Sequence, residues 1–254
     1  MGVKPILKYP GAKWRIAPWI IDNLPPHEIY LEPFFGSGAV FFNKEQSRLE
    51  TINDIDGNVV NLFRVLREQP EELAALIELT PWSRDEYYAS YEKTGDAIED
   101  ARRYLVRCWQ AFGTLTAART GWRHSATGRA PVMPSQWRNL PERICCMADR
   151  LKDAQIENMD AIKLIEKYND PHCLIYADPP YLPGTRRKNI YAEEMTTEQH
   201  IELLEALMAH SGTVVLSGYA NELYDEKLAG WMRMERKAQA ERGQARTEVL
   251  LIKR

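Results

Sequence analysis

The sequence lacks the residue patterns that mark metal sites and nucleotide-phosphate loops. Its four cysteines form no Cys-x-x-Cys pair, its five histidines form no His-Glu-x-x-His motif, and no Gly-x4-Gly-Lys-[Ser/Thr] loop is present. These absences disfavour a zinc site and a P-loop enzyme, so we expect no bound metal. Cysteines without such partners are typical of reduced thiols, which we expect to be buried.

Long apolar runs are missing as well. No uninterrupted run reaches the ~18 residues needed to cross a bilayer, and the first residues lack the apolar stretch of a signal peptide. With 254 residues, of which 44% are hydrophobic, the chain can still bury a sizeable core, either as one domain with a large insertion or as two small domains. We expect a cytoplasmic protein without a membrane segment.

Charge is nearly balanced overall but not along the chain, whose formal net charge is −3. Residues 68–100 contain ten acids and two bases, whereas residues 101–146 contain eight arginines and one acid. Residues 233–254 add seven bases and three acids. This pattern predicts a nucleic-acid-binding face, because arginine suits phosphates and guanine edges. The alternative is that these arginines pair with the neighbouring acids.

Hydrophobic patterning predicts an α/β fold with a mostly parallel sheet. Strands are expected at 29–32, 51–54, 155–157, 173–177 and 213–217, with a closing pair of strands in 231–253. Helices are expected at 37–43, from 59 onward, at 141–152, at 161–168 and at 196–210. Residues 70–111 have helical spacing, and residues 112–137, rich in Gly, Thr, Trp and Arg, predict a hairpin or long loop. We therefore expect a core formed by segments 1–58 and 151–254, split by an insertion at 59–150.

The most informative motif is Asp178-Pro179-Pro180-Tyr181, which follows a predicted buried strand. The prolines stiffen the loop and remove two donors, so its carbonyl groups can accept hydrogen bonds. A carboxylate beside a carbonyl suits an amino group with two hydrogens to donate, and Tyr181 offers a flat face to a planar ring. The motif predicts a site for an exocyclic amine on a flat heterocycle such as adenine. The alternative is a strand that ends in a proline-rich turn.

Two further motifs predict a small-ligand site. Gly36-Ser37-Gly38 follows the first strand and allows close approach to the backbone. Asp54 lies 18 residues after Gly36, at the end of the second strand, where an acid can accept hydrogen bonds from ribose hydroxyls. Phe41 stands where a dinucleotide fingerprint has its third glycine, which disfavours a dehydrogenase. Residues 8–14 can form a loop that closes over the ligand, although a plain basic arm is the alternative.

Taken together, these motifs resemble those of the Dam-type adenine-specific DNA methyltransferases. The matching segments are 8–13, 31–38, 53–56, 178–181 and 216–219, and their order and spacing cover nearly the whole chain, most weakly at 68–150. The resemblance implies a Rossmann-like methyltransferase fold, S-adenosylmethionine as cofactor, double-stranded DNA as substrate and a bacterial or phage-infected host cell. It also implies that the insertion recognises the DNA target. We expect a monomer, and no motif indicates a partner nuclease.

The resemblance also assigns residues to roles. The implied cofactor site comprises Tyr9, Lys13, Phe35, Gly36, Gly38, Asp54, Asp160 and Asp178. The implied catalytic site, which holds the target adenine, comprises Asp178, Pro179, Pro180 and Tyr181. The sequence departs from the family where Tyr9 replaces a frequent Trp and Ala12 replaces the second Gly of a Trp-x-Gly-Gly-Lys loop. Both departures affect the loop over the cofactor, where stacking and flexibility can differ.

The candidate DNA contacts lie mostly in the insertion. They are Arg119, Trp122, Arg123, His124, Arg129, Gln136, Arg138, Arg186 and Arg187. Trp122 lies between two of these arginines and is interpreted as a packing residue or a wedge.

The chemistry requires a flipped-out base, because the adenine amino group is unreachable inside a duplex. Three alternatives remain open. A methyltransferase for cytosine N4 or a protein amide needs similar chemistry, although the families known for it tend to have Ser or Asn in place of Asp178. An inactive DNA-binding relative is expected to lose Asp178, Asp54 or the glycines, which are all present. A nucleotide-dependent oxidoreductase lacks its fingerprint here.

Overall fold

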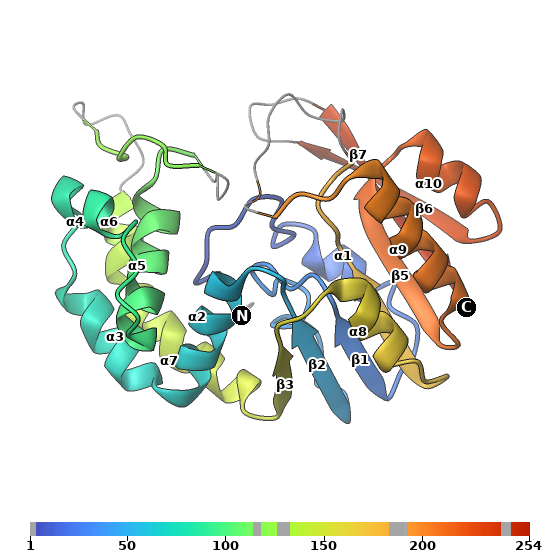
Figure 1. Cartoon of the computed structure of the whole chain (residues 1–254), viewed down its shortest axis with the longest axis horizontal. Coiled ribbons are helices and arrows are strands. Elements are labelled where there is room, and N and C mark those ends of the chain that lie inside the picture. Colours follow the sequence, from blue (N-terminus) through green and yellow to red (C-terminus); the bar gives the residue numbers. More distant parts are fainter. Residues whose placement is uncertain (1–3, 114–117, 126–132, 183–190, 192, 240–244) are drawn as a thin grey trace.

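A single mixed sheet forms the centre of the molecule (Figure 1). The computed structural model describes residues 4–113, 118–125, 133–182, 191, 193–239 and 245–254. Within them the strand order is β3-β2-β1-β4-β5-β7-β6. The strands are β1 (Ile29–Glu32), β2 (Leu49–Asn53), β3 (Ala154–Glu157), β4 (Cys173–Ala177), β5 (Thr213–Tyr219), β6 (Met232–Gln239) and β7 (Ala245–Lys253). The first five pair in parallel and β7 is antiparallel to both neighbours, which confirms the expected α/β fold and the closing strand pair.

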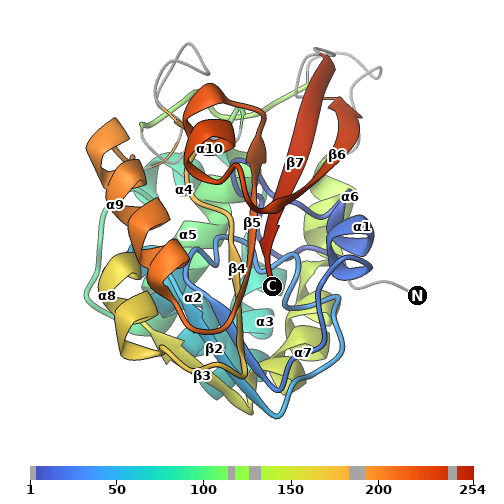
Figure 2. The ribbon, with the colours of Figure 1, turned by 90° about the vertical axis from the view of Figure 1, so that its right-hand side faces the viewer.

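Helices cover both faces of the sheet, as the apolar strands require. Alternate strand residues enter different layers: Tyr30 and Leu174 join one buried cluster, whereas Leu31 and Ile175 join the other. The second cluster lies under α8 (Ala161–Lys167), α9 (Thr197–Ala209) and α10 (Glu222–Lys227). The first lies under α1 (Ala17–Ile21) and α2 (Gly57–Glu68). Figure 2 shows α8 and α9 on the side opposite to α1.

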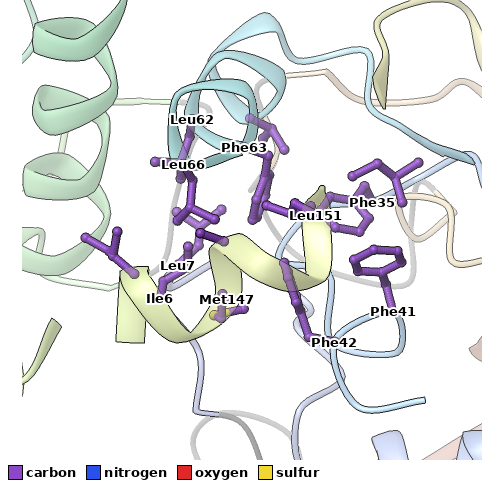
Figure 3. Close-up of a cluster of buried hydrophobic side chains, with 14 of the residues drawn as sticks. Ile6, Leu7, Phe35, Phe41, Phe42, Leu62, Phe63, Leu66, Met147 and Leu151 are labelled. Atoms are coloured by element: carbon purple, nitrogen blue, oxygen red, sulfur yellow. The ribbon is translucent and has the colours of Figure 1, made fainter. Parts of the chain in front are cut away.

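A group of helices connects β2 to β3. It comprises α2, α3 (Pro70–Leu79), α4 (Arg84–Ala89), α5 (Ala97–Gln110), α6 (Met133–Arg138) and α7 (Leu140–Leu151). Figure 1 shows most of these helices gathered beyond the β3 edge of the sheet. The apolar sides of α2 and α7 enclose Phe63, Leu66 and Met147, and they meet the aromatic turn after β1 (Figure 3). The helical spacing at 70–111 and the helix at 141–152 are thus confirmed.

The helix expected at 37–43 is wrong. Residues 36–43 form successive turns, with Gly36 at φ +49° and Gly38 at φ +66°. A residue in this left-handed region interrupts a right-handed helix. The turns instead bring the Phe42 ring to Phe63, with centroids 5.9 Å apart, and the Phe41 ring to Phe35, with centroids 5.5 Å apart.

Residues 133–138 form the short helix α6 rather than a loop or hairpin. Its Trp137 is buried between Trp82 and Trp109, and the Trp137 indole N–H donates to the Thr80 carbonyl at 2.9 Å. Burial of this large side chain fixes the segment against the other helices.

The expectation of four buried cysteines is half wrong. Cys108 and Cys173 are buried, whereas Cys145 and Cys146 are exposed, and all four are free thiols. Helix α7 buries Ile144 and Met147, so the two positions between them fall on its outer side. Among the described residues, none of the helices has both the length and the hydropathy of a membrane span.

The strand order reverses between β1 and β4, which lie side by side in the middle of the sheet. In open α/β sheets, ligands bind at the carboxyl ends of strands beside such a reversal. The loops after β1, β2 and β4 carry the glycine turn, Asp54 and Asp178, respectively. The topology therefore brings the three sequence motifs to one edge of the sheet.

Candidate active site

A cavity of about 540 Å³ lies at this edge of the sheet. Its walls include most of the residues assigned from the sequence: Tyr9, Lys13, Phe35, Gly36, Asp54, Asp160, Asp178 and Pro180. Gly38 has a packing role instead, because a Cβ atom there would lie 2.5 Å from the Phe35 ring. Pro179 and Tyr181 line a small hollow behind the loop, together with Ser217 and Tyr219. Most of the motif residues thus surround one cavity, whereas Pro179 and Tyr181 line the second hollow.

Asp54 supports the glycine turn from below. Its Oδ2 accepts a hydrogen bond from the Gly36 backbone N–H at 2.8 Å, and its Oδ1 accepts one from the Asp56 N–H at 2.9 Å. Burial raises the pKa of Asp54 to about 7, against the lowering effect of these backbone donors. Each carboxylate oxygen keeps a second lone pair for a further donor. Asp54 can therefore brace the turn and still bind ligand hydroxyls.

The N-terminal loop closes over the glycine turn. The Trp14 indole N–H donates to Ser37 Oγ at 3.0 Å. The Tyr9 ring lies against Gly36, where an added Cβ atom would be 3.0 Å from it. Glycine at 36 is thus required both by its positive φ and by this close approach. The loop forms one wall of the cavity.

Asp178 is held in a polar network at the centre of the site. Its Oδ1 accepts a hydrogen bond from Ser217 Oγ at 2.8 Å and lies 3.0 Å from Lys13 Nζ. Ser217 Oγ also bonds with the Tyr176 hydroxyl at 3.0 Å. Burial lowers the pKa of Lys13, but Asp178, Tyr181 and Glu248 outweigh it and hold this pKa well above its ordinary value. Lys13 is therefore an ammonium paired with the motif carboxylate.

Tyr181 already takes part in a parallel ring stack. Its ring and that of Tyr219 have centroids 4.2 Å apart at an interplanar angle of 11°. Lys13 Nζ donates to the Tyr181 hydroxyl at 2.7 Å, at the edge of the same ring. Offset parallel geometry is the one that flat rings favour. Tyr181 therefore already stacks on a ring of the protein itself, and its stacking with a target base stays a prediction.

Glu32 is a site residue that sequence reasoning missed. It is the last residue of β1, lines the cavity and is 2% exposed, and its Oε2 accepts a hydrogen bond from the Tyr30 hydroxyl at 2.7 Å. Burial raises the pKa of Glu32 to about 8, Tyr30 lowers it and Asp178 raises it further. Glu32 is thus mostly protonated at neutral pH. An acid at the end of an otherwise apolar strand was the available signal.

A Glu32→Gln variant is expected to become more stable than the wild type as the pH rises. The unfolded carboxyl loses its proton above its ordinary pKa of 4.5, whereas the folded one keeps it up to about 8. Between these two pKa values the folded wild type keeps a proton that the unfolded chain has lost. The stability of the wild type therefore falls as the pH rises through this range. The relative gain of the variant between pH 5 and 8 is expected to be at most about 4 kcal/mol.

Urea unfolding of both proteins at pH 5 and pH 8, without ligand, measures this gain. The titration of Asp54 contributes equally to both proteins, so the difference isolates Glu32. Stability curves that stay parallel across this range would contradict the raised pKa.

The candidate DNA contacts occupy the helical group and its loop. Arg119 is exposed, with its guanidinium 5.3 Å from the Tyr88 ring, and Arg123 is half-buried. Trp122 donates to Gln110 Oε1 at 3.0 Å and stacks on His124 at 5.5 Å. Of the two roles considered for Trp122, these contacts support packing.

Gln136 and Arg138 are exposed on α6. Arg129, Arg186 and Arg187 lie outside the described residues. Arg102 and Arg103 instead form ion pairs with Glu99 at 2.7 Å. For these two arginines, the alternative of pairing with neighbouring acids is confirmed.

The sequence comparisons match a methyltransferase family and proteins named as methyltransferases or methylases. A family model described as D12 class N6 adenine-specific DNA methyltransferase matches residues 9–241. The chain is 26% identical over 208 residues to the Type II methyltransferase M.MjaIII of Methanocaldococcus jannaschii, with 72% of this chain and 71% of that protein covered. It is 27% identical over 201 residues to the Type II methyltransferase M1.LlaDCHI of Lactococcus lactis subsp. cremoris (72% and 67%). It is 25% identical over 236 residues to the DNA adenine methylase of Escherichia coli strain K12 (87% and 82%).

Proposed function

The chain belongs to the D12 class of N6 adenine-specific DNA methyltransferases, and we propose that it transfers a methyl group from S-adenosylmethionine to the N6 amino group of an adenine flipped out of double-stranded DNA. The observation that carries this proposal is the position of Asp178. Its carboxylate lies in the cavity wall that also contains the glycine turn, beside the stacked ring of Tyr181. We propose that the enzyme acts as a monomer in the cytoplasm.

The cavity suits the chemistry of S-adenosylmethionine. Its volume of about 540 Å³ lies in the range of small-ligand sites. Asp54 would accept hydrogen bonds from the ribose hydroxyls, and Gly36 lets the ligand approach the backbone. Tyr9, Phe35 and Asp160 would complete the walls around the cofactor. When bound, the cofactor supplies an electrophilic methyl group on a sulfonium.

Asp178 prepares the target nitrogen. The lone pair of adenine N6 is delocalised into the ring, so this amine is a poor nucleophile. If Asp178 and the Pro179 carbonyl each accept one N–H, the nitrogen shifts toward tetrahedral geometry and its lone pair becomes available. Ser217 fixes the carboxylate for this task through its 2.8 Å hydrogen bond. Fixed positions supply much of the rate acceleration in such a reaction.

Stacking supports the flipped base. Extrusion from the duplex costs a few kcal/mol, and a ring stacked on an aromatic side chain recovers about 1–3 kcal/mol. Tyr181 supplies such a ring, and its geometry with Tyr219 illustrates that a planar group can lie flat against it.

One experiment tests the proposed function directly. The protein is incubated with methyl-labelled S-adenosylmethionine and DNA from a host without DNA methylation. We expect labelled N6-methyladenine after digestion, and long-read sequencing of the product gives its sequence context. Labelled N4-methylcytosine, or no label in DNA, would contradict the proposal.

We further propose that residues 59–150 form the target-recognition domain. At least one of Arg119, Arg123 and Arg129 is expected to read a base. Its alanine variant should lose about 1–3 kcal/mol of affinity on the proper site alone, whereas a lost phosphate contact weakens binding on all sequences and reduces the salt slope by about one. Binding of DNA with and without the mapped site, at several salt concentrations, separates these outcomes.

Arg103→Ala is the matched control for these variants, since its guanidinium pairs with Glu99. We expect it to keep both affinity and sequence preference. Uniform loss of affinity in all three test variants would place recognition elsewhere in the chain.

A further inference from the structure

Lys13 lies between the half-buried carboxylate of Asp178 and the buried carboxylate of Glu248. Its Nζ is 3.0 Å from Asp178 Oδ1 and 3.8 Å from Glu248 Oε2, and the lysine and Glu248 side chains are 5% and 9% exposed. Glu248 belongs to β7, where it pairs with Tyr219 of β5. Strand register thus places this distant acid behind the catalytic loop. The Lys13 ammonium lies within hydrogen-bonding distance of Asp178 but is too far from Glu248 to form a hydrogen bond with it.

Glu248 has an unsatisfied oxygen. Its Oε2 is buried and makes no hydrogen bond within the described part of the chain. Buried polar atoms nearly always have a partner, so such an exception calls for an explanation. Burial raises the pKa of Glu248, Lys13 lowers it and Asp178 raises it again. The cation nearest to this carboxylate, the Lys13 ammonium, is already paired with Asp178.

The groups that hold Lys13 are the ones that the target adenine needs. Lys13 Nζ contacts Asp178 Oδ1 and the Tyr181 hydroxyl. A neutral amino group is a weaker donor than an ammonium, because hydrogen bonds from charged donors are stronger. The Lys13 ammonium also offsets the negative charge of Asp178. That charge should stabilise the target nitrogen, which becomes positive during methyl transfer. A second place for Lys13 would therefore favour methyl transfer.

We propose, on the basis of the proposed function, that Glu248 is a positioning residue onto which the Lys13 ammonium moves when the target amino group binds Asp178. The required movement is about 1 Å, from the present 3.8 Å to a normal charge-assisted contact. The flexible four-carbon stem of lysine permits it. Glu32 is not a suitable acceptor, because its Oε2 already accepts a hydrogen bond from Tyr30.

Single-turnover methylation tests this role with Glu248→Gln, which keeps shape and removes charge. We expect a rate at least tenfold below wild type, with the dissociation constant for S-adenosylmethionine within twofold and an unfolding midpoint no lower. Glu248→Asp keeps the charge at shorter reach and should recover part of the rate. Glu222→Gln, at an exposed position of α10, is the matched control and should equal the wild type.

A Glu248→Gln rate within threefold of wild type would overturn the proposal, as would an aspartate variant no faster than the glutamine one. If wild type and control fail to methylate DNA as well, the proposed function itself is wrong.

A crystal structure of Asp178→Asn gives a readout that needs no activity. We expect Lys13 Nζ within hydrogen-bonding distance of a Glu248 oxygen, because the competing negative charge is gone. An ammonium that stays near residue 178 and away from Glu248 would overturn the proposal.

Discussion

Methyl transfer to DNA is expected to fall about 100-fold or more in an Asp178→Ala variant, whereas DNA binding should change by less than about threefold. The carboxylate is the acceptor proposed for the target N–H, and Ser217 holds it in place through a hydrogen bond of 2.8 Å. Alanine removes this acceptor and leaves the loop backbone intact. Incorporation of labelled methyl groups in a single turnover, together with fluorescence anisotropy of labelled DNA, measures the two effects.

Two further variants sharpen this experiment. Asp178→Asn keeps the size and one acceptor oxygen, so a comparable loss of rate would assign the effect to the negative charge. Asp153→Ala removes an exposed aspartate outside the site and should methylate DNA like the wild type. Label incorporation by Asp178→Ala within tenfold of wild type would show that another group activates the amine.

The sequence predicts most of the fold because its strands are strongly patterned. Apolar runs such as 173–177 become fully buried parallel strands, and amphipathic segments such as 141–152 become helices against them. The failures are local. Apolar residues suggest a helix at 37–43, but Gly36 and Gly38 adopt positive φ to place the turn beneath the ligand cavity. Here the geometry of the site, rather than the local preference for a helix, determines the backbone conformation.

The candidate site is only partly predictable, for a topological reason. Asp54 and Asp178 each follow a parallel strand, and the carboxyl ends of parallel strands meet at one edge of a sheet. Motif position alone therefore brings them together. Glu248 approaches Lys13 only through the antiparallel pairing of β7 with β5, whose register no local pattern specifies. Glu32 ends an otherwise apolar strand, but its burial and raised pKa follow from the packing around it, which no local pattern specifies.

Above its pKa of about 7, where Asp54 is ionised, an Asp54→Ala variant is expected to weaken binding of S-adenosylmethionine by about 1.5–3 kcal/mol, the loss typical of hydrogen bonds to a charged acceptor. Calorimetry with cofactor alone measures this. An unchanged dissociation constant would show that Asp54 does not contact the ligand.

The structure requires a second comparison, because Asp54 also holds the Gly36 N–H at 2.8 Å, and loss of this brace can by itself disturb the cavity. A cofactor product analogue without the ribose 2′-hydroxyl separates the two roles. If Asp54 binds the ribose, wild type should prefer S-adenosylhomocysteine over its 2′-deoxy form, and Asp54→Ala should lose most of that preference. If Asp54 only braces the turn, the variant should bind both ligands more weakly by the same factor. In that case residue 54 makes no contact with the ribose 2′-hydroxyl.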